Sequence, residues 1–314
     1  MRRIDRRSLL QNSFAATGMA AFSPALNSLG TNSLPGVEEQ RVGVTTARDR
    51  MWIFTVEAGL TDDYLEAGGV RGGSRMTPAE GAFYLNLPNL IFVRADGRPP
   101  LPKLQGWRSK ATFDQYAISF RPLQRVVWSI GSSSGVEQDE LLSVLSVAGR
   151  FPNIVGVYLD DFFTQEGKAM LSTEKLAALR ERLNVPGRKL EVWSTLYTHQ
   201  LNYPLASYLE LFDVTTLWTW NSDELKDLEG NLEKLEKIRP RTRKGLGCYM
   251  WDFLNHRPVS VQQMELQCKA GLEWLTKGRV SHMIFLASSM CDVGLEVVDW
   301  TRQWIQQAGK QRLG

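Results

Sequence analysis

The stretch Ile154-Val155-Gly156-Val157-Tyr158-Leu159-Asp160-Asp161 joins a strongly apolar run to two consecutive carboxylates. Its β-branched and aromatic residues favour a buried strand. Further along, apolar residues recur at helical spacing over 173–183. A buried strand followed by an amphipathic helix is the unit from which parallel α/β sheets are built.

The same unit recurs along the rest of the chain. Strands are predicted at 52–56, 90–94, 126–130, 154–159, 190–195, 214–218, 246–250 and 283–287. Helices are predicted at 77–87, 113–123, 139–148, 173–183, 201–211, 222–238, 260–276 and 295–307. Thr77, Ser222 and Ser260 stand at helix starts as capping residues. Eight units in about 260 residues predict the α/β class and one closed (β/α)8 TIM barrel, a single domain over 48–314.

The N-terminus has the features of an export signal. Arg6-Arg7-Ser8-Leu9-Leu10 resembles the twin-arginine motif, and no charged residue follows until Glu38. The apolar part of 14–26 is too short to span a bilayer. We therefore expect a signal peptide over 1–30, a flexible tether over 31–47, and a periplasmic or extracellular protein without stable membrane insertion. A disordered basic N-terminus and an uncleaved anchor are the alternatives.

The charge balance of the chain depends on this leader. The leader carries four Arg and one Asp, or +3, which equals the formal net charge of the whole chain. A mature protein near neutrality does not favour nucleic acid as a partner. The cysteines Cys248, Cys268 and Cys291 are three and contain no CxxC pair, which excludes a disulfide-built or zinc-ribbon protein.

Polar and aromatic residues gather at the predicted carboxyl ends of the strands, where barrels of this kind keep their active sites. The acidic residues at these ends are costly unless they are paired, hydrogen-bonded or functional. A helix N-cap or a salt bridge with a barrel arginine is the structural alternative for each of them. The strand ends carry Glu57, Arg94 and Asp96, Ser129, Asp160 and Asp161, Tyr197 and His199, Trp218, Trp220 and Asn221, Trp251 and Asp252, and Asp292.

Alternation along the fourth strand indicates which side chains face the barrel axis. Val155, Val157 and Leu159 suit the helix-covered face, which leaves Tyr158 and Asp160 pointing inward. We expect Asp160 or Asp161, with Asp252, to act as the acid/base pair, and Glu57 to be an auxiliary carboxylate.

Aromatic rings at the same rim favour carbohydrate as the partner, because flat rings suit the apolar faces of sugars. Trp218, Trp220 and Trp251 are the predicted sugar platforms, although bulky rings also fill barrel interiors. The polar residues expected to contact substrate beside them are Tyr197, His199, Arg94, Asp96 and Asn221.

This layout resembles the barrel glycoside hydrolases that carry an acid/base after the fourth strand and a nucleophile after the seventh. The matching positions are Asp160 or Asp161 and Asp252. That group generally uses Glu, whereas both sites here are Asp. The resemblance implies a glycosidase, which the leader would direct out of the cytoplasm, and the shorter side chains favour a water-mediated, inverting reaction.

Two other functions remain open on the same scaffold. Glu57, Asp160, Asp252 and His199 would offer oxygen and nitrogen ligands for Mg²⁺ or Mn²⁺ in a sugar isomerase, epimerase or lyase. A non-catalytic barrel would use the carboxylates only to bind sugar hydroxyls. The glycosidase hypothesis requires no cofactor.

Overall fold

The computed structural model describes residues 45–94, 112–132 and 135–314. They belong to one compact unit, Val44–Gly314. The predicted signal peptide, most of the predicted tether and Asp96 lie outside the described residues. The end of the predicted tether packs on the domain, because Ala47–Arg50 form the 3-10 helix η2 and Thr46 bridges to Arg312.

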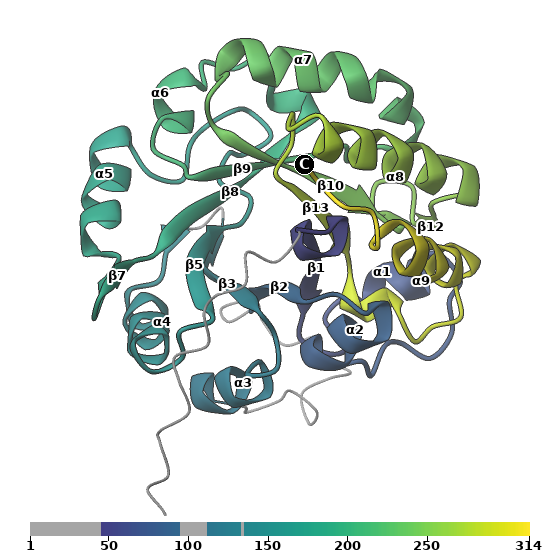
Figure 1. The fold of residues 1–314 in the computed structure, drawn as a ribbon, viewed down its shortest axis with the longest axis horizontal. Coiled ribbons are helices and arrows are strands. Elements are labelled where there is room, and N and C mark those ends of the chain that lie inside the picture. Colours follow the sequence, from purple (N-terminus) through teal and green to yellow (C-terminus); the bar gives the residue numbers. More distant parts are fainter. Residues whose placement is uncertain (1–44, 95–111, 133–134) are drawn as a thin grey trace, which may run out of the picture. The chain divides into compact units, whose positions relative to one another are not determined.

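Eight parallel strands close into a barrel, which confirms the predicted fold class (Figure 1). Each strand pairs in parallel with its neighbours, and the pairing of β2 with β3 closes the ring. The eight strands, in order around the barrel, are β1 (Met51–Val56), β2 (Asn89–Val93), β3 (Arg125–Ser132), β5 (Ile154–Leu159), β8 (Glu191–Tyr197), β9 (Val214–Trp218), β10 (Arg243–Tyr249) and β13 (His282–Leu286). All eight coincide with a predicted strand.

Helices surround the barrel strands in Figure 1. They are α1 (Asp62–Ala67), α2 (Pro78–Leu85), α3 (Phe113–Ser119), α4 (Gln138–Arg150), α5 (Thr173–Arg182), α6 (Ala206–Leu209), α7 (Leu228–Ile238), α8 (Val261–Thr276) and α9 (Glu296–Ala308). The helix predicted over 201–211 is reduced to α6. Short antiparallel ribbons, which the periodicity did not predict, pair β3 with β4 (Gly135–Val136), β6 (Asn184–Val185) with β7 (Arg188–Lys189), and β11 (Trp251–Asp252) with β12 (Arg257–Pro258).

Two of the three predicted helix caps are confirmed. Thr77 and Ser260 each accept a hydrogen bond from the backbone three residues on and form capping boxes at α2 and α8. Ser222 is not the cap of its helix. The 3-10 helix η5 (Ser222–Asp227) is capped by Asn221 and precedes α7, and the Ser222 hydroxyl binds Asp252 instead.

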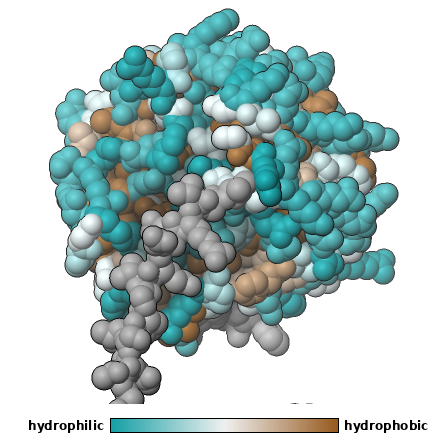
Figure 2. Space-filling model, in the orientation of Figure 1, coloured by the Kyte–Doolittle hydropathy of each residue, from teal (hydrophilic) through white to brown (hydrophobic). Residues whose placement is uncertain are grey.

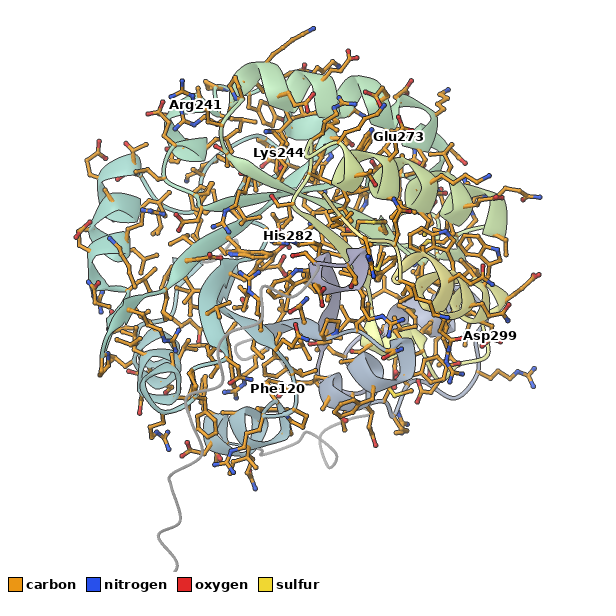
Figure 3. All side chains as sticks on the ribbon, viewed as in Figure 1. Phe120, Arg241, Lys244, Glu273, His282 and Asp299 are labelled. Carbon is orange, nitrogen blue, oxygen red and sulfur yellow. The ribbon has the colours of Figure 1, made fainter. Side chains whose placement is uncertain are left out.

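The amino-terminal end of the barrel is filled by rings. Figure 3 shows His282 at the centre, between the strands. Its ring stacks on Trp193 with centroids 4.7 Å apart, and its Nδ1 accepts a hydrogen bond of 3.2 Å from Trp52. Glu191, at the start of β8, pairs with Arg125 at 3.6 Å. Buried rings and ion-paired side chains therefore pack this end of the barrel.

The surface in Figure 2 is largely hydrophilic, with smaller apolar areas among the polar side chains. Among the described residues no helix combines the length and apolarity needed to cross a bilayer.

Candidate active site

A cavity opens at the carboxyl ends of the strands, where the fold class predicts chemistry. All eight barrel strands, or the residues directly after them, contribute to its lining. The lining residues that concern the predicted site are Arg94, Asp160, Asp161, Tyr197, Trp218 and Trp220, and the structure brings these six together.

The carboxylates occupy one side of this cavity. Asp160 and Asp161 follow β5, whereas the strand opposite β5 in the ring is β13. From that strand end the cavity is lined by Leu286 and Ala287. The described part of the cavity therefore has an acidic wall facing an apolar wall.

Asp160 faces the barrel axis, as the alternation along its strand predicts. Its Oδ1 lies 2.9 Å from the Thr195 hydroxyl. Thr195 also contacts the Tyr158 hydroxyl at 2.9 Å, and Tyr158 reaches Thr216 at 2.7 Å. A buried hydroxyl network from β5, β8 and β9 thus lies beneath Asp160 and restrains its orientation.

Asp161 also reaches the cavity, through its backbone conformation. Its φ is 48°, in the left-handed region that a residue other than glycine rarely adopts. The Tyr197 hydroxyl donates a hydrogen bond of 2.6 Å to its Oδ1. Such conformations persist only where the surroundings enforce them, and they concentrate at functional sites.

Two tyrosine hydroxyls lie close to these carboxylates. Burial raises the pKa of Tyr197 well above its ordinary value, and the nearby Tyr249, Asp161 and Asp160 raise it further. Burial and the same two carboxylates act on the pKa of Tyr249 in the same direction. Both phenols therefore remain protonated at neutral pH, as hydrogen-bond donors.

The tryptophans predicted as platforms occupy different positions. Trp218 is 1% exposed, lies at the floor of the cavity and donates its indole N–H to Thr216 at 2.8 Å. Trp220 is partly exposed and stacks on Phe253 with ring centroids 5.9 Å apart. Trp251 is fully buried and does not line the cavity; its ring packs against Gly68.

A second cavity adjoins the first. Asp161, Tyr197 and Trp220 line both. His199 lines only the second, where its exposed ring stacks on Tyr197 with centroids 5.6 Å apart and planes 7° apart. Burial lowers the pKa of His199. The first cavity encloses about 180 Å³ and the second about 280 Å³.

Asp252 does not line either cavity. Its side chain is inaccessible to solvent, and its Oδ2 accepts hydrogen bonds from the Ser222 hydroxyl at 2.5 Å and from the Asn255 amide at 2.9 Å. Its Oδ1 accepts from the backbone N–H groups of Leu254 and Asn255. Burial raises its pKa, but these hydrogen bonds outweigh burial and leave the pKa lowered. This is the environment of a carboxylate that holds a loop together.

Glu57 is likewise turned away from the cavity. It accepts a hydrogen bond of 2.8 Å from Tyr116 and lies 3.9 Å from the Arg94 guanidinium. Arg94 lines the cavity and stands 4.3 Å from the Phe113 ring centroid. Asn221 caps η5 and lines neither cavity.

The ligand set considered for Mg²⁺ or Mn²⁺ is not assembled. Glu57 and Asp252 are held by other partners, and His199 lies in the second cavity. No cluster of three or more His, Cys, Asp or Glu suited to a metal ion occurs within 45–94, 112–132 and 135–314.

Several cavity residues were missed by the sequence reasoning. Thr195 lies two residues before Tyr197 on β8, so strand alternation alone places both on one face. Tyr64, Tyr249 and Phe253 also line the cavity. Tyr64 comes from α1, which the periodicity did not predict.

No family model and no curated protein matches the sequence. Solved structures do match the fold. Active domain 2 of the Pyrococcus furiosus chitinase aligns with a TM-score of 0.50 at 8% identity, over 82% of this chain and 95% of that chain. The GH99 endo-α-mannosidase from Bacteroides thetaiotaomicron aligns with a TM-score of 0.50 at 9% identity, over 82% and 97%. An EDTA monooxygenase from Chelativorans sp. BNC1 aligns with a TM-score of 0.48 at 8% identity, over 84% and 96%. The chain thus resembles barrel glycoside hydrolases in fold, and the function has to be argued from the site.

Proposed function

We propose that the protein is a carbohydrate-active barrel enzyme, a glycoside hydrolase whose carboxylates are Asp160 and Asp161. The observation that carries this proposal is the position of both side chains in an aromatic-walled cavity at the carboxyl ends of the strands. Glycosidic bonds are cleaved by carboxyl groups that donate a proton, activate water or attack the sugar. The sequence predicted a catalytic pair made of Asp252 and one of these two residues. The proposal does not include Asp252, because its carboxylate is held outside both cavities.

The side chains around the two carboxylates have separate tasks. Thr195 and Tyr197 orient Asp160 and Asp161, so that the carboxylates do not have to be ordered when substrate binds. Trp220 offers apolar surface to a sugar ring, and the buried Trp218 forms the floor of the cavity beneath it. Arg94 adds a positive charge to the cavity at the end of β2, between the carboxylates and the opposite wall, where it can bind a hydroxyl or a developing anion.

The test is release of reducing ends from a panel of β-glucans, chitins and mannans by the mature protein. Asp160→Asn and Asp161→Asn keep the side-chain volume and should each lower kcat by at least about 10²-fold, the usual worth of such a group. Asp139→Asn, at the exposed start of α4, is the matched control and should leave turnover unchanged. Near-normal turnover in both cavity variants, with the proteins folded, would overturn the assignment.

A non-catalytic sugar-binding barrel is the second candidate. In two-carboxylate glycosidases the two carboxyl groups lie on either side of the scissile bond. Here the wall opposite Asp160 and Asp161 is apolar, which favours a barrel that only binds sugar. Calorimetric binding of the same sugars without any product from the wild-type protein would select this candidate.

A further inference from the structure

Six aromatic rings follow one another along the rim of the barrel. Consecutive ring centroids are 5.6, 5.4, 5.9, 5.2 and 5.9 Å apart. The rings form three stacked pairs, with planes 7°, 25° and 23° apart, and the pairs meet edge to face at 82°. In order, this rim arc consists of His199, Tyr197, Trp220, Phe253, Tyr64 and His256.

The first five rings of the rim arc follow the order of the strands around the barrel. They come from the end of β8 and from the segments after β8, β9, β10 and β1, and only β13 separates β10 from β1 in the ring. The sixth ring, His256, comes from the segment after β10, like Phe253, so the last step turns back towards that segment. From Tyr197 to Tyr64 the arc therefore extends along the cavity mouth. Its two ends, His199 and His256, are exposed histidines.

The arc also passes from one cavity to the next. His199 lines only the second cavity, Tyr197 and Trp220 line both, and Tyr64 lines only the first. His256 lies beyond both. A ligand that contacts the whole arc is therefore longer than either cavity. Aromatic rings that continue over more than one cavity suit a chain of several sugars better than a single sugar.

The carboxylates lie near one end of the arc. Asp161 lines both cavities and accepts the hydrogen bond from Tyr197, the second ring. A chain on the arc would place its short part in the second cavity, beside His199. Its longer part would follow Trp220 and Tyr64 towards His256.

We infer that the substrate is a linear oligosaccharide or polysaccharide bound along the rim arc on both sides of Asp161, an inference that rests on the proposed function. The shortest sugars can contact only part of the arc, so affinity increases with chain length. The exposed end rings contribute to long chains more than to short ones. A compact cluster that only packs loops together would produce neither effect.

The experiment is calorimetry with β-1,4-linked oligomers of glucose, N-acetylglucosamine and mannose, of two to six units. All proteins carry Asp160→Asn to prevent turnover. For the sugar that binds, affinity should increase by about tenfold or more from the shortest to the longest oligomer, as expected when further rings are stacked. His199→Ala and His256→Ala should each weaken the longest oligomer by about fivefold or more, and the loss should grow with chain length.

Phe83→Ala, an exposed ring on α2, is the matched control and should change no affinity. Melting temperatures establish that each variant is folded. Equal affinity for short and long oligomers, or a length dependence that both histidine variants retain, would overturn the inference and leave the proposed function intact. If oligomers of no length bind the Asp160→Asn protein, and the wild-type protein neither binds nor cleaves them, the proposed function itself fails.

Discussion

The Tyr197 hydroxyl donates a hydrogen bond of 2.6 Å to Oδ1 of Asp161, at the boundary between the two cavities. Asp161 has a left-handed backbone, and the phenol that orients it comes from the next strand around the barrel. The hydrogen bond therefore links the position of the Asp161 carboxylate to the Tyr197 ring, which lines both cavities.

Tyr197→Phe removes this hydrogen bond and keeps the ring. Hydrogen bonds to charged groups contribute about 1.5–3 kcal/mol, so kcat should fall by about 10- to 100-fold. The measurement is steady-state kinetics on the sugar that the wild-type protein cleaves. Tyr203→Phe is the control. The Tyr203 hydroxyl donates a hydrogen bond to the Gln165 carbonyl, and Tyr203 lines neither cavity. Equal kinetics for the two variants would contradict an orienting role for Tyr197.

Asp252→Ala should destabilise the protein without removing the site. It leaves the buried hydroxyl and backbone N–H of Ser222 without their acceptor, and each such group costs about 1–3 kcal/mol. Chemical denaturation should show a loss of at least about 2 kcal/mol, with turnover per folded molecule retained. Asp223→Ala, which removes an exposed ion pair with Arg257, should cost about 0–1 kcal/mol. A stable but inactive Asp252→Ala protein would restore the seventh-strand carboxylate to the mechanism.

The eight strands were predictable because buried parallel strands are short, apolar and separated by helices. The end of β10 shows where this reasoning stops. Trp251 and Asp252 leave the barrel and pair with Arg257–Pro258 as a hairpin, so their direction no longer follows from alternation along the strand. Glu57 lies directly after β1, as Asp160 lies directly after β5, but its carboxylate is bound by Tyr116, a contact that alternation does not predict. Asp160 lies directly after β5, still follows the alternation of its strand, and its inward position was predicted correctly.

The site also depends on contacts that no local pattern contains. Tyr64 comes from a six-residue helix, and its neighbour Phe253 lies far along the chain. Asp161 reaches the cavity with a positive φ, a conformation that strand alternation does not predict. A strand pattern gives the rim positions, but the loops decide which side chains turn inward.

Trp218 and Trp220 should respond differently to replacement by alanine. Trp218 is buried and hydrogen-bonded at the cavity floor, so Trp218→Ala should cost about 3–5 kcal/mol. Trp220→Ala should lower the melting temperature less and increase KM, because Trp220 is partly exposed at both cavities. The two variants are compared by thermal unfolding and initial rates. A larger stability loss for Trp220 than for Trp218 would assign Trp220 to the core.

Export is tested at the motif itself. Arg6→Lys with Arg7→Lys keeps the positive charge and removes the arginine pair, so the full-length protein should accumulate in the cytoplasm. Cell fractionation and the size of the product measure this outcome. Replacing Arg2 and Arg3 by Lys, outside the motif, is the control. Unchanged export of the first variant would exclude the twin-arginine pathway.

Because His282 is buried, we expect the free energy of unfolding to depend on pH. Burial lowers the pKa of His282 well below the ordinary 6.5, and the charges of Arg125, Arg243 and Arg50 lower it further. Above pH 6.5 His282 is neutral in both the folded and the unfolded chain, so it adds no pH dependence. Below pH 6.5 the unfolded chain binds a proton that the folded barrel excludes. Unfolding is therefore favoured as the pH falls, with a slope that approaches about 1.4 kcal/mol per pH unit.

The measurement is the free energy of unfolding between pH 7.5 and about pH 5, above the range in which carboxylates titrate. His282→Asn offers Trp52 an acceptor in place of Nδ1 and removes the titration, so its stability should fall less steeply with decreasing pH. His199→Asn is the control, because His199 is exposed and its pKa is lowered less than that of His282. If the free energy of unfolding depends on pH as steeply in His282→Asn as in the wild-type protein, and less steeply in His199→Asn, then His282 does not carry the pH dependence.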